Sequence, residues 1–178
     1  MPKRQALSLP KIWLMTDERL GDALLSSIAA LPKGSGIVFR HYGLDAEARK
    51  KLFFKVSAVA RRHRHIIVVG GAPIAAPVWL IAGRHGRVRS AITSPVHSLR
   101  EAIAAERAGA KLLFVSPIFS TQTHLGASAL GRARFGLLAL NLHIPIIALG
   151  GMNKARARSL GIMKIHGWAA ISALAVTR

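Results

Sequence analysis

Short apolar runs of strand length alternate along this chain with segments that carry their apolar residues at helical spacing. The runs are rich in valine, isoleucine, leucine and aromatic residues, as is typical of buried strands. Strands joined by helical crossovers lie parallel in one sheet, because each helix returns the chain to the edge where the previous strand began. The pattern predicts eight strands, at residues 11–17, 36–41, 65–71, 78–83, 90–96, 112–119, 145–149 and 166–174.

Eight strand–helix units favour a (β/α)8 TIM barrel, an α/β fold in which the strands close into a cylinder inside a ring of helices. Such barrels usually contain about 250 residues, whereas this chain has 178, so we expect a compact barrel and a single domain over residues 1–178. The crossovers after the third and fourth strands are shortened to "APIAAP" and "RHGRVR", and no full eighth helix fits after residue 174. An open doubly wound sheet is the alternative, and it suits the chain length better.

Helices are expected at residues 18–31, 45–62, 98–109, 132–143 and 153–163. Asp45, Ser98 and Asn153 stand at the starts of three of them, where a short polar side chain can accept a hydrogen bond from a free backbone N–H. Glu101, three residues after Ser98, completes a capping box, and Gly109 suits the end of that helix.

The composition is that of a globular chain, with 51% hydrophobic and 19% charged residues. The absence of cysteine excludes disulfides and thiolate chemistry and fits a reducing compartment, so we expect a cytoplasmic protein. Lys11 interrupts the mildly apolar start and no small-residue cleavage pattern follows it, which argues against a signal peptide. No apolar run approaches the roughly 18 residues that a membrane span requires, so no membrane association is expected.

The net charge is +19, from 26 Lys and Arg against 7 Asp and Glu. Such an imbalance favours anionic partners, either phosphorylated metabolites or nucleic acid, and a solvated basic surface is the alternative explanation. A nucleic-acid surface needs exposed aromatic residues among its basic ones. Only 6% of the residues are aromatic, and Trp13, Trp79 and Trp168 all fall inside predicted strands. A small phosphorylated metabolite is therefore the preferred partner, and nucleic acid ranks last.

Two glycines, Gly150 and Gly151, end the predicted seventh strand, and Asn153 starts the next helix. Ligand phosphates in TIM barrels are often held by the loops after strands seven and eight. Glycines let backbone N–H groups approach an anion closely, and a helix N-terminus is electropositive. Ile171 and Ser172, at the end of the eighth strand, face the same point. The two strand ends together predict a phosphate site, although a tight turn alone would also explain the glycines.

The segment "VHSLREAIAAERAGAKLLFVSPIFSTQTH", followed by "IPIIALGGMN" and "GWAAISAL", resembles the C-terminal half of the thiamine-phosphate synthase and TenI family. The resemblance covers about residues 90–174, and the N-terminal half is similar only in layout. It implies a (β/α)8 barrel and a transferase of thiamine biosynthesis. Such a synthase joins a pyrimidine pyrophosphate to a thiazole phosphate and releases pyrophosphate with the assistance of magnesium.

The resemblance also implies roles for individual residues. The thiazole phosphate would be held through the backbone amides of Gly150, Gly151, Ile171 and Ser172. Thr121 and Thr123, in "FSTQTH", match the hydroxyls of the family's "FPTxTK" loop, and Arg40 matches the arginine of its "QxRxK" motif. His124 takes the place of the loop lysine, and histidine is a weaker cation than lysine because its charge depends on pH. The expected catalytic set is therefore Arg40, Thr121, Thr123 and His124.

Several family positions are occupied by other residues here. Val38 and Tyr42 replace the glutamine and lysine around Arg40, and Pro117 stands where the tautomerase branch has a histidine. The family's acidic segments after strands three and four are replaced by "GG" and "GRHGRV". Only Asp17, with Glu18 next to it, lies at a strand end, whereas magnesium on a pyrophosphate usually needs one or two carboxylates. Magnesium is thus expected from the family while its carboxylate ligands are lacking, and no metal site is predicted.

Three hypotheses follow. The first is a synthase-like enzyme in which Arg84, Arg87 and Arg40 neutralise the pyrophosphate in place of the metal. The second is a catalytically degenerate, TenI-like barrel that still binds a phosphorylated ligand, and the third is a polyanion-binding barrel.

His41 and His97 lie near strand ends and are candidates for proton transfer, with a purely structural role as the alternative.

Two further expectations concern surfaces. His63, His65 and His85 sit in basic segments and are expected at the surface. Without a full eighth helix, the apolar surface between the eighth and first strands would be exposed. We expect this seam to be covered by residues 1–10 or by a homo-oligomer contact.

Overall fold

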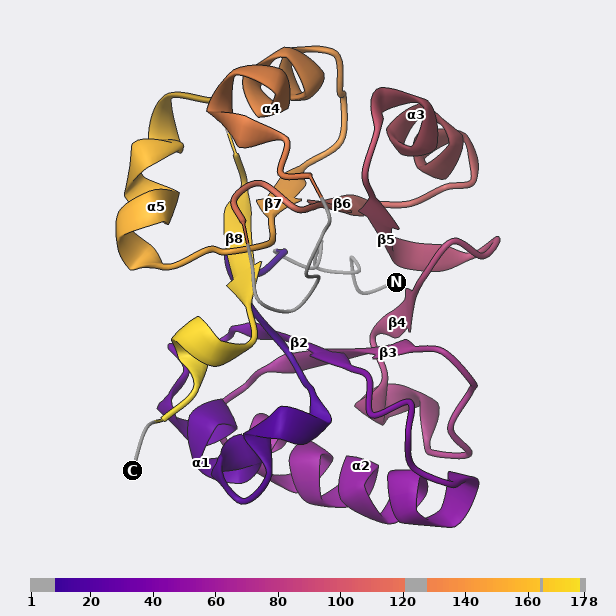
Figure 1. Ribbon diagram of the computed structural model, residues 1–178. Coiled ribbons are helices and arrows are strands. Elements are labelled where there is room, and N and C mark those ends of the chain that lie inside the picture. The colour runs from indigo at the N-terminus through magenta and orange to yellow at the C-terminus, as the bar shows by residue number, and fades with distance from the viewer. Residues whose placement is uncertain (1–8, 121–127, 164, 177–178) are drawn as a thin grey trace, which may run out of the picture.

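The structure is a computed structural model that describes residues 9–120, 128–163 and 165–176. Its strands form one closed parallel barrel in chain order (Figure 1). The strands are β1 (Ile12–Met15), β2 (Gly36–Phe39), β3 (Ile66–Gly70), β4 (Gly83–His85), β5 (Ala91–Val96), β6 (Leu112–Val115), β7 (Ile146–Ala148) and β8 (Gly167–Ala170). Since β1 pairs with β8 in parallel, with Leu14 opposite Ala170, the predicted barrel is confirmed and the open-sheet alternative is wrong.

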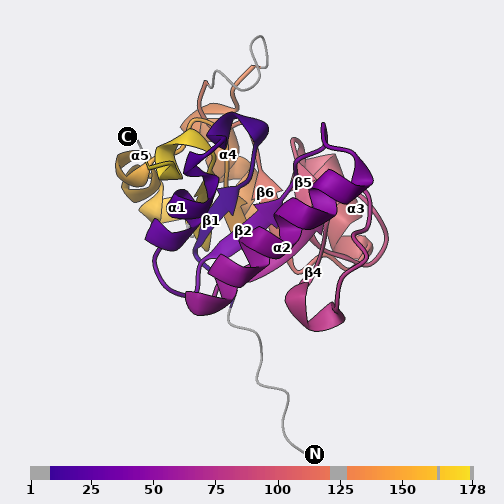
Figure 2. The same ribbon diagram turned by 90° about the horizontal axis from the view of Figure 1, so that it is seen from below.

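Five α-helices surround the strands in the described residues: α1 (Ala23–Ala30), α2 (Ala46–Arg62), α3 (Leu99–Arg107), α4 (Gly131–Leu140) and α5 (Lys154–Ser159). The helices α1 and α2 pack against each other outside the first strands (Figures 1 and 2). The three predicted N-caps are confirmed: Asp45 accepts a hydrogen bond from the N–H of Ala48, Ser98 from Glu101 and Asn153 from Arg156. None of these helices is long and apolar enough to cross a membrane.

The predicted strand at 78–83 is wrong. Val78–Leu80 forms a short 3-10 turn, η2, and β4 begins only at Gly83, partly within the segment expected to be a turn. The side chain of Leu80 packs against the core from outside, and Trp79 is 66% exposed. With no helix in this crossover, the apolar run itself covers the barrel wall. The crossovers after β3 and β4 are short, as expected.

The end of the chain also differs from the prediction. Strand β8 stops at Ala170, and the 3-10 turn η5 (Ser172–Leu174) follows in place of a longer strand. Leu174 and Ala175 pack against the core, and the N–H of Val176 donates to Ser27 Oγ at 2.9 Å, so the last described residues are fastened to α1. The N-terminal arm expected over the seam lies largely outside the described residues, so that expectation stays a prediction.

Large side chains fill the barrel interior. Trp13 is fully buried and meets the ring of Phe114 edge-on, with ring centroids 5.3 Å apart. A Cβ atom on Gly36 would lie 2.2 Å from the Trp13 ring, so the neighbouring strand leaves room for the indole only because that residue is glycine. This packed interior confines ligand access to the ends of the barrel.

Candidate functional site

A cavity of about 320 Å³ opens at the C-terminal ends of the last strands. Its walls come from the loops after β6, β7 and β8, together with Arg19 and Arg40 from the first two units. A larger cavity of about 800 Å³ lies at the opposite end, beside Lys11, Ile146 and His166. Because TIM barrels carry their sites at the C-terminal ends of the strands, the smaller cavity is the candidate site.

Gly150 and Gly151 form one wall of this cavity, in backbone conformations with φ of 91° and 59°. A Cβ atom at Gly150 would lie 2.6 Å from Cα of Pro117, and one at Gly151 would lie 2.6 Å from the carbonyl oxygen of Ser120. The loop after β6 is therefore pressed against the loop after β7. The two glycines are required by this close contact as well as by any anion that they hold.

Ile171 and Ser172 also line this cavity, where β8 ends and η5 begins. The structure therefore places all four residues predicted to hold a phosphate around one cavity, with Arg40 on the same lining. Their binding role stays a prediction. Thr121, Thr123 and His124 lie outside the described residues, so their roles also remain predictions.

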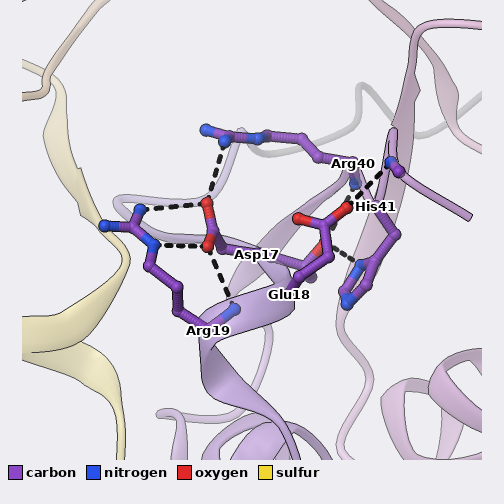
Figure 3. A network of polar contacts seen from close by, with 7 residues as sticks. Asp17, Glu18, Arg19, Arg40 and His41 are labelled. Carbon is purple, nitrogen blue, oxygen red and sulfur yellow. Dashed lines mark hydrogen bonds and ion pairs between the residues drawn. The ribbon is translucent and has the colours of Figure 1, made fainter. Parts of the chain in front are cut away.

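Arg40 belongs to a polar cluster with Asp17 and Arg19 (Figure 3). Asp17 follows β1, and its side chain is only 8% exposed. One of its oxygens, Oδ1, accepts from the backbone N–H and Nε of Arg19, at 3.1 and 2.6 Å. The other, Oδ2, accepts from Nη2 of Arg19 and Nη2 of Arg40, both at 3.0 Å. This single carboxylate thus orients two guanidinium groups at the edge of the cavity.

The electrostatics of the cluster follow from these contacts. The hydrogen bond from the Arg19 side chain is the main reason why the pKa of Asp17 lies below its usual value, and burial opposes it. The same bond raises the pKa of Arg19. The carboxylate is therefore ionised at neutral pH, and two cations against one anion leave a net positive charge on the cluster.

Arg19 was missed by the sequence argument, which named Arg84 and Arg87 as partners of Arg40. Arg84 lies in β4 and Arg87 pairs with Glu101 at 2.7 Å, and neither lines the cavity. The available signal was the position of Arg19 two residues after the only strand-end aspartate. Its contact with that aspartate depends on η1 (Glu18–Leu20), a 3-10 turn that Asp17 caps.

The donor set at this mouth does not fit magnesium. All seven carboxylate side chains of the chain belong to described residues, and none of them lines the cavity. Both oxygens of Asp17 are taken by arginines, and Glu18 accepts from the N–H of Gly43 at 3.1 Å. In the described part of the chain, no three acidic or histidine side chains are grouped to hold a metal ion.

The two histidines considered for proton transfer have structural partners. His41 is buried, and its Nδ1 lies 3.1 Å from Thr16 Oγ1, while burial lowers its pKa. His97 is exposed, with Nδ1 2.7 Å from the carbonyl oxygen of Ser116. Neither histidine lines the cavity, so the geometry favours the structural alternative for both.

The expectation that His65 and His85 lie at the surface is wrong, because both are buried. His85 is on β4 and points into the barrel, where its Nδ1 lies 2.9 Å from Thr93 Oγ1, and burial is the main cause that lowers its pKa to about 4. His65 Nε2 lies 3.0 Å from the carbonyl oxygen of Ile28. The error for His85 follows from the misplaced strand, since a side chain's direction depends on strand register.

The closed eight-stranded barrel, with its candidate site at the C-terminal ends of β7 and β8, defines a TIM-barrel protein. The sequence model of the family described as "Thiamine monophosphate synthase" matches residues 12–174. This chain belongs to that family, which confirms the resemblance found in the sequence.

Individual relatives differ in how much of the chain they match. "Putative thiamine-phosphate synthase 2" of Aquifex aeolicus is 26% identical over 182 residues, which cover 93% of this chain and 98% of that protein. "Thiamine-phosphate synthase" of Pyrococcus furiosus is 36% identical over 83 residues, which span only 40% of that protein's length. The solved thiamine phosphate pyrophosphorylase from Pyrococcus furiosus has a TM-score of 0.72 at 22% identity, covering 91% of this chain and 85% of that chain, which supports the fold.

Proposed function

We propose that the mouth cavity binds a phosphorylated metabolite, and that its phosphate lies between the loop after β7 and the end of β8. The thiazole phosphate used by the family is the first ligand to test. The observation that carries the proposal is the convergence of Gly150 and Gly151 with Ile171 and Ser172 on one cavity of about 320 Å³. Backbone N–H groups at such strand ends can donate hydrogen bonds to phosphate oxygens.

The full synthase reaction is a second candidate, favoured by family membership and by the guanidinium groups at the same cavity. In this reaction the carbon–oxygen bond between the pyrimidine methylene and pyrophosphate breaks, and both electrons leave with pyrophosphate. The lone pair of the thiazole nitrogen then forms the new carbon–nitrogen bond. Arg40, Thr121, Thr123 and His124 are the residues proposed to contact the pyrophosphate side.

Isothermal titration of the chain with thiazole phosphate tests the first proposal. We expect saturable binding that Gly151→Ala weakens at least tenfold, because the added Cβ occupies the narrow gap beside Ser120. Gly161→Ala is the control, since its Cβ would meet nothing within 4 Å. Thermal melts of both variants separate lost binding from lost folding. No binding to the native chain would overturn the proposal.

Product formation tests the second candidate. The chain is supplied with the pyrimidine pyrophosphate and the thiazole phosphate, with and without magnesium, and thiamine phosphate is measured. Thiamine phosphate in either condition supports the synthase reaction. Binding of thiazole phosphate without any product supports the first proposal and rejects the second.

A polyanion surface remains the weakest of the three hypotheses. Trp79 is exposed, contrary to the prediction, and the guanidinium of Arg61 lies 4.8 Å from its ring centroid. Basic residues, however, occur on each of α2, α3, α4 and α5 rather than along one stripe. Duplex binding that persists above roughly 0.2 M salt would favour this hypothesis, because purely electrostatic binding fades there. The proposal keeps a small metabolite as partner and the cytoplasm as compartment.

A further inference from the structure

We infer that Arg19 and Arg40, oriented by Asp17, form an arginine clamp that binds a second anionic group, a diphosphate, without a divalent cation. This inference rests on the proposed function, since it concerns the same cavity. It differs from that proposal in the residues involved and in the ligand group, so that each can fail alone.

The clamp is built to face the cavity. Asp17 is nearly buried, whereas the side chains of Arg19 and Arg40 are 51% and 22% exposed, and both line the cavity. The Nε of Arg40 is buried and makes no hydrogen bond among the described residues, so it is not exposed to a ligand. Both guanidinium groups use Nη2 on the carboxylate of Asp17, and no hydrogen bond from Nη1 of either arginine occurs among the described residues, so these N–H donors remain for a ligand.

The backbone of Arg40 is fixed on both sides. Its N–H donates to Thr16 Oγ1 at 2.9 Å, and its carbonyl oxygen accepts from Nε of Arg49 at 3.0 Å. The buried Arg49 also donates to the carbonyl oxygens of Gly70 and Ala72, at 2.6 and 2.8 Å, so it ties the end of β2 to the end of β3. Arg49 is a positioning residue, and the clamp is preorganised rather than free to follow any ligand.

The same geometry opposes a metal ion. A divalent cation bound to Asp17 would have to displace the donors of two arginines and would then lie beside their positive charges. A guanidinium offers paired N–H donors whose spacing matches two phosphate oxygens, and it stays charged at any physiological pH. The clamp can thus supply at this mouth the positive charge that magnesium supplies to a pyrophosphate elsewhere.

Isothermal titration with inorganic pyrophosphate tests the inference on the native chain, once with EDTA and once with magnesium chloride at equal ionic strength. We expect binding in EDTA and no gain in affinity with magnesium, because the ion competes for pyrophosphate in solution. Binding that requires magnesium would overturn the inference. This arm needs no variant, so its outcome does not depend on whether a variant folds.

Arg19→Gln tests the role of the clamp itself, and Arg87→Gln is the matched control. Both arginines are about half exposed and each pairs with one carboxylate, at 2.6 and 2.7 Å, but only Arg19 lines the cavity. We expect Arg19→Gln to weaken pyrophosphate binding at least tenfold and Arg87→Gln to leave it unchanged. Native affinity in Arg19→Gln, or an equal loss in both variants, would refute the clamp.

Two further measurements separate the possible failures. Arg19→Lys keeps the charge but loses the planar fork, so an affinity between those of the native chain and Arg19→Gln is expected; native affinity would reject paired recognition. Titration of Arg19→Gln with thiazole phosphate is expected to retain binding, because the glycine wall is intact. Pyrophosphate binding that depends on Arg19 in a chain that does not bind thiazole phosphate would leave the clamp standing and reject the proposed function.

Discussion

Gly150 is constrained by the protein itself before any ligand is considered. Its φ of 91° lies in the left-handed region, and the space where a Cβ would stand is occupied by Cα and Cβ of Pro117, at 2.6 and 2.8 Å. The N–H of Phe119 donates to the carbonyl oxygen of Gly150 at 3.1 Å and holds the two loops together. Neither loop can retreat from an added methyl group without losing this contact.

Replacement of Gly150 by alanine is therefore expected to destabilise the fold. Gly150→Ala should lower the free energy of unfolding by about 2 kcal/mol or more, because a left-handed conformation and a backbone clash add together. Gly161→Ala, with open space around its Cβ, should change it little. Urea denaturation followed by circular dichroism measures both. Similar stabilities of the two variants would show that the loop after β6 moves freely.

At the residue scale, the sequence predicted the positions of those candidate site residues that lie directly at strand ends. Gly150, Gly151, Ile171 and Ser172 were brought to one cavity as expected, because parallel strands in a barrel end on one side. Arg19 was not predicted, because its side chain turns back onto Asp17 through the geometry of one 3-10 turn. Periodicity does not report such local geometry.

At the scale of elements, two helices start at an aspartate but use it differently. Asp45, before α2, accepts a hydrogen bond from the N–H of Ala48 at 2.8 Å, from an extended backbone conformation. Asp22, before α1, has helical φ and ψ and makes no capping hydrogen bond. The same residue type at the same position thus stabilises one helix and not the other.

This difference predicts unequal effects of alanine substitution. Asp45→Ala should lower the free energy of unfolding by about 1 kcal/mol, because one N–H at the start of α2 loses its partner. Asp22→Ala, which removes the same charge without a cap, should cost clearly less and serves as the control. The measurement is again urea denaturation at constant pH. A loss of equal size in both variants would attribute the effect to charge rather than to capping.

Helices and strands were predicted correctly where the apolar residues of a segment follow a single helix or strand spacing, and incorrectly where the crossover between strands is short. The amphipathic segment of α2 and the alternation of strands and helices were read correctly from spacing alone. The run "VWLI" has the composition of a strand, yet Pro77 precedes it and Val78–Leu80 forms η2 outside the barrel. Which apolar run enters the barrel depends on what else can cover its wall, and that is a tertiary property.

Across the whole molecule, three histidines are buried in forms that resist protonation. Burial is the largest cause that lowers the pKa values of His41, His65 and His85, the last to about 4. Below pH 6.5 the unfolded chain takes up protons that the native chain does not, so the free energy of unfolding decreases as the pH is lowered. For His85 alone the loss between pH 6.5 and 4 amounts to about 3 kcal/mol.

His85→Asn tests this dependence, since it removes the titrating ring and keeps a polar group near Thr93. The variant should be less stable at neutral pH because of the lost packing, but its free energy of unfolding should fall less steeply between pH 6.5 and 4. His143→Asn, at an exposed position, is the control for the loss of one histidine. Denaturant titrations at several pH values give the slopes. An unchanged slope in His85→Asn would show that other groups control acid unfolding.

The net charge of +19 acts on the whole molecule in a second way. Seven carboxylates cannot neutralise 26 basic side chains, and only three ion pairs within 4.0 Å occur among the described residues, so repulsion among the basic side chains is largely uncompensated. Such self-repulsion destabilises the compact state and is screened by salt. Screening also weakens the exposed ion pairs, but each of these contributes at most about 1 kcal/mol.

Salt is therefore expected to stabilise this chain. Raising sodium chloride from about 10 to 150 mM shortens the screening length from roughly 30 to 8 Å. A gain of about 1 kcal/mol in the free energy of unfolding corresponds to a rise in Tm of roughly 2–4 °C for a chain of this size.

Sodium sulfate at equal ionic strength should raise Tm further if the arginine clamp holds a divalent anion. The variant Arg19→Gln should lose that extra rise while keeping the chloride effect. A Tm that falls with chloride would mean that attractive pairs outweigh the repulsion.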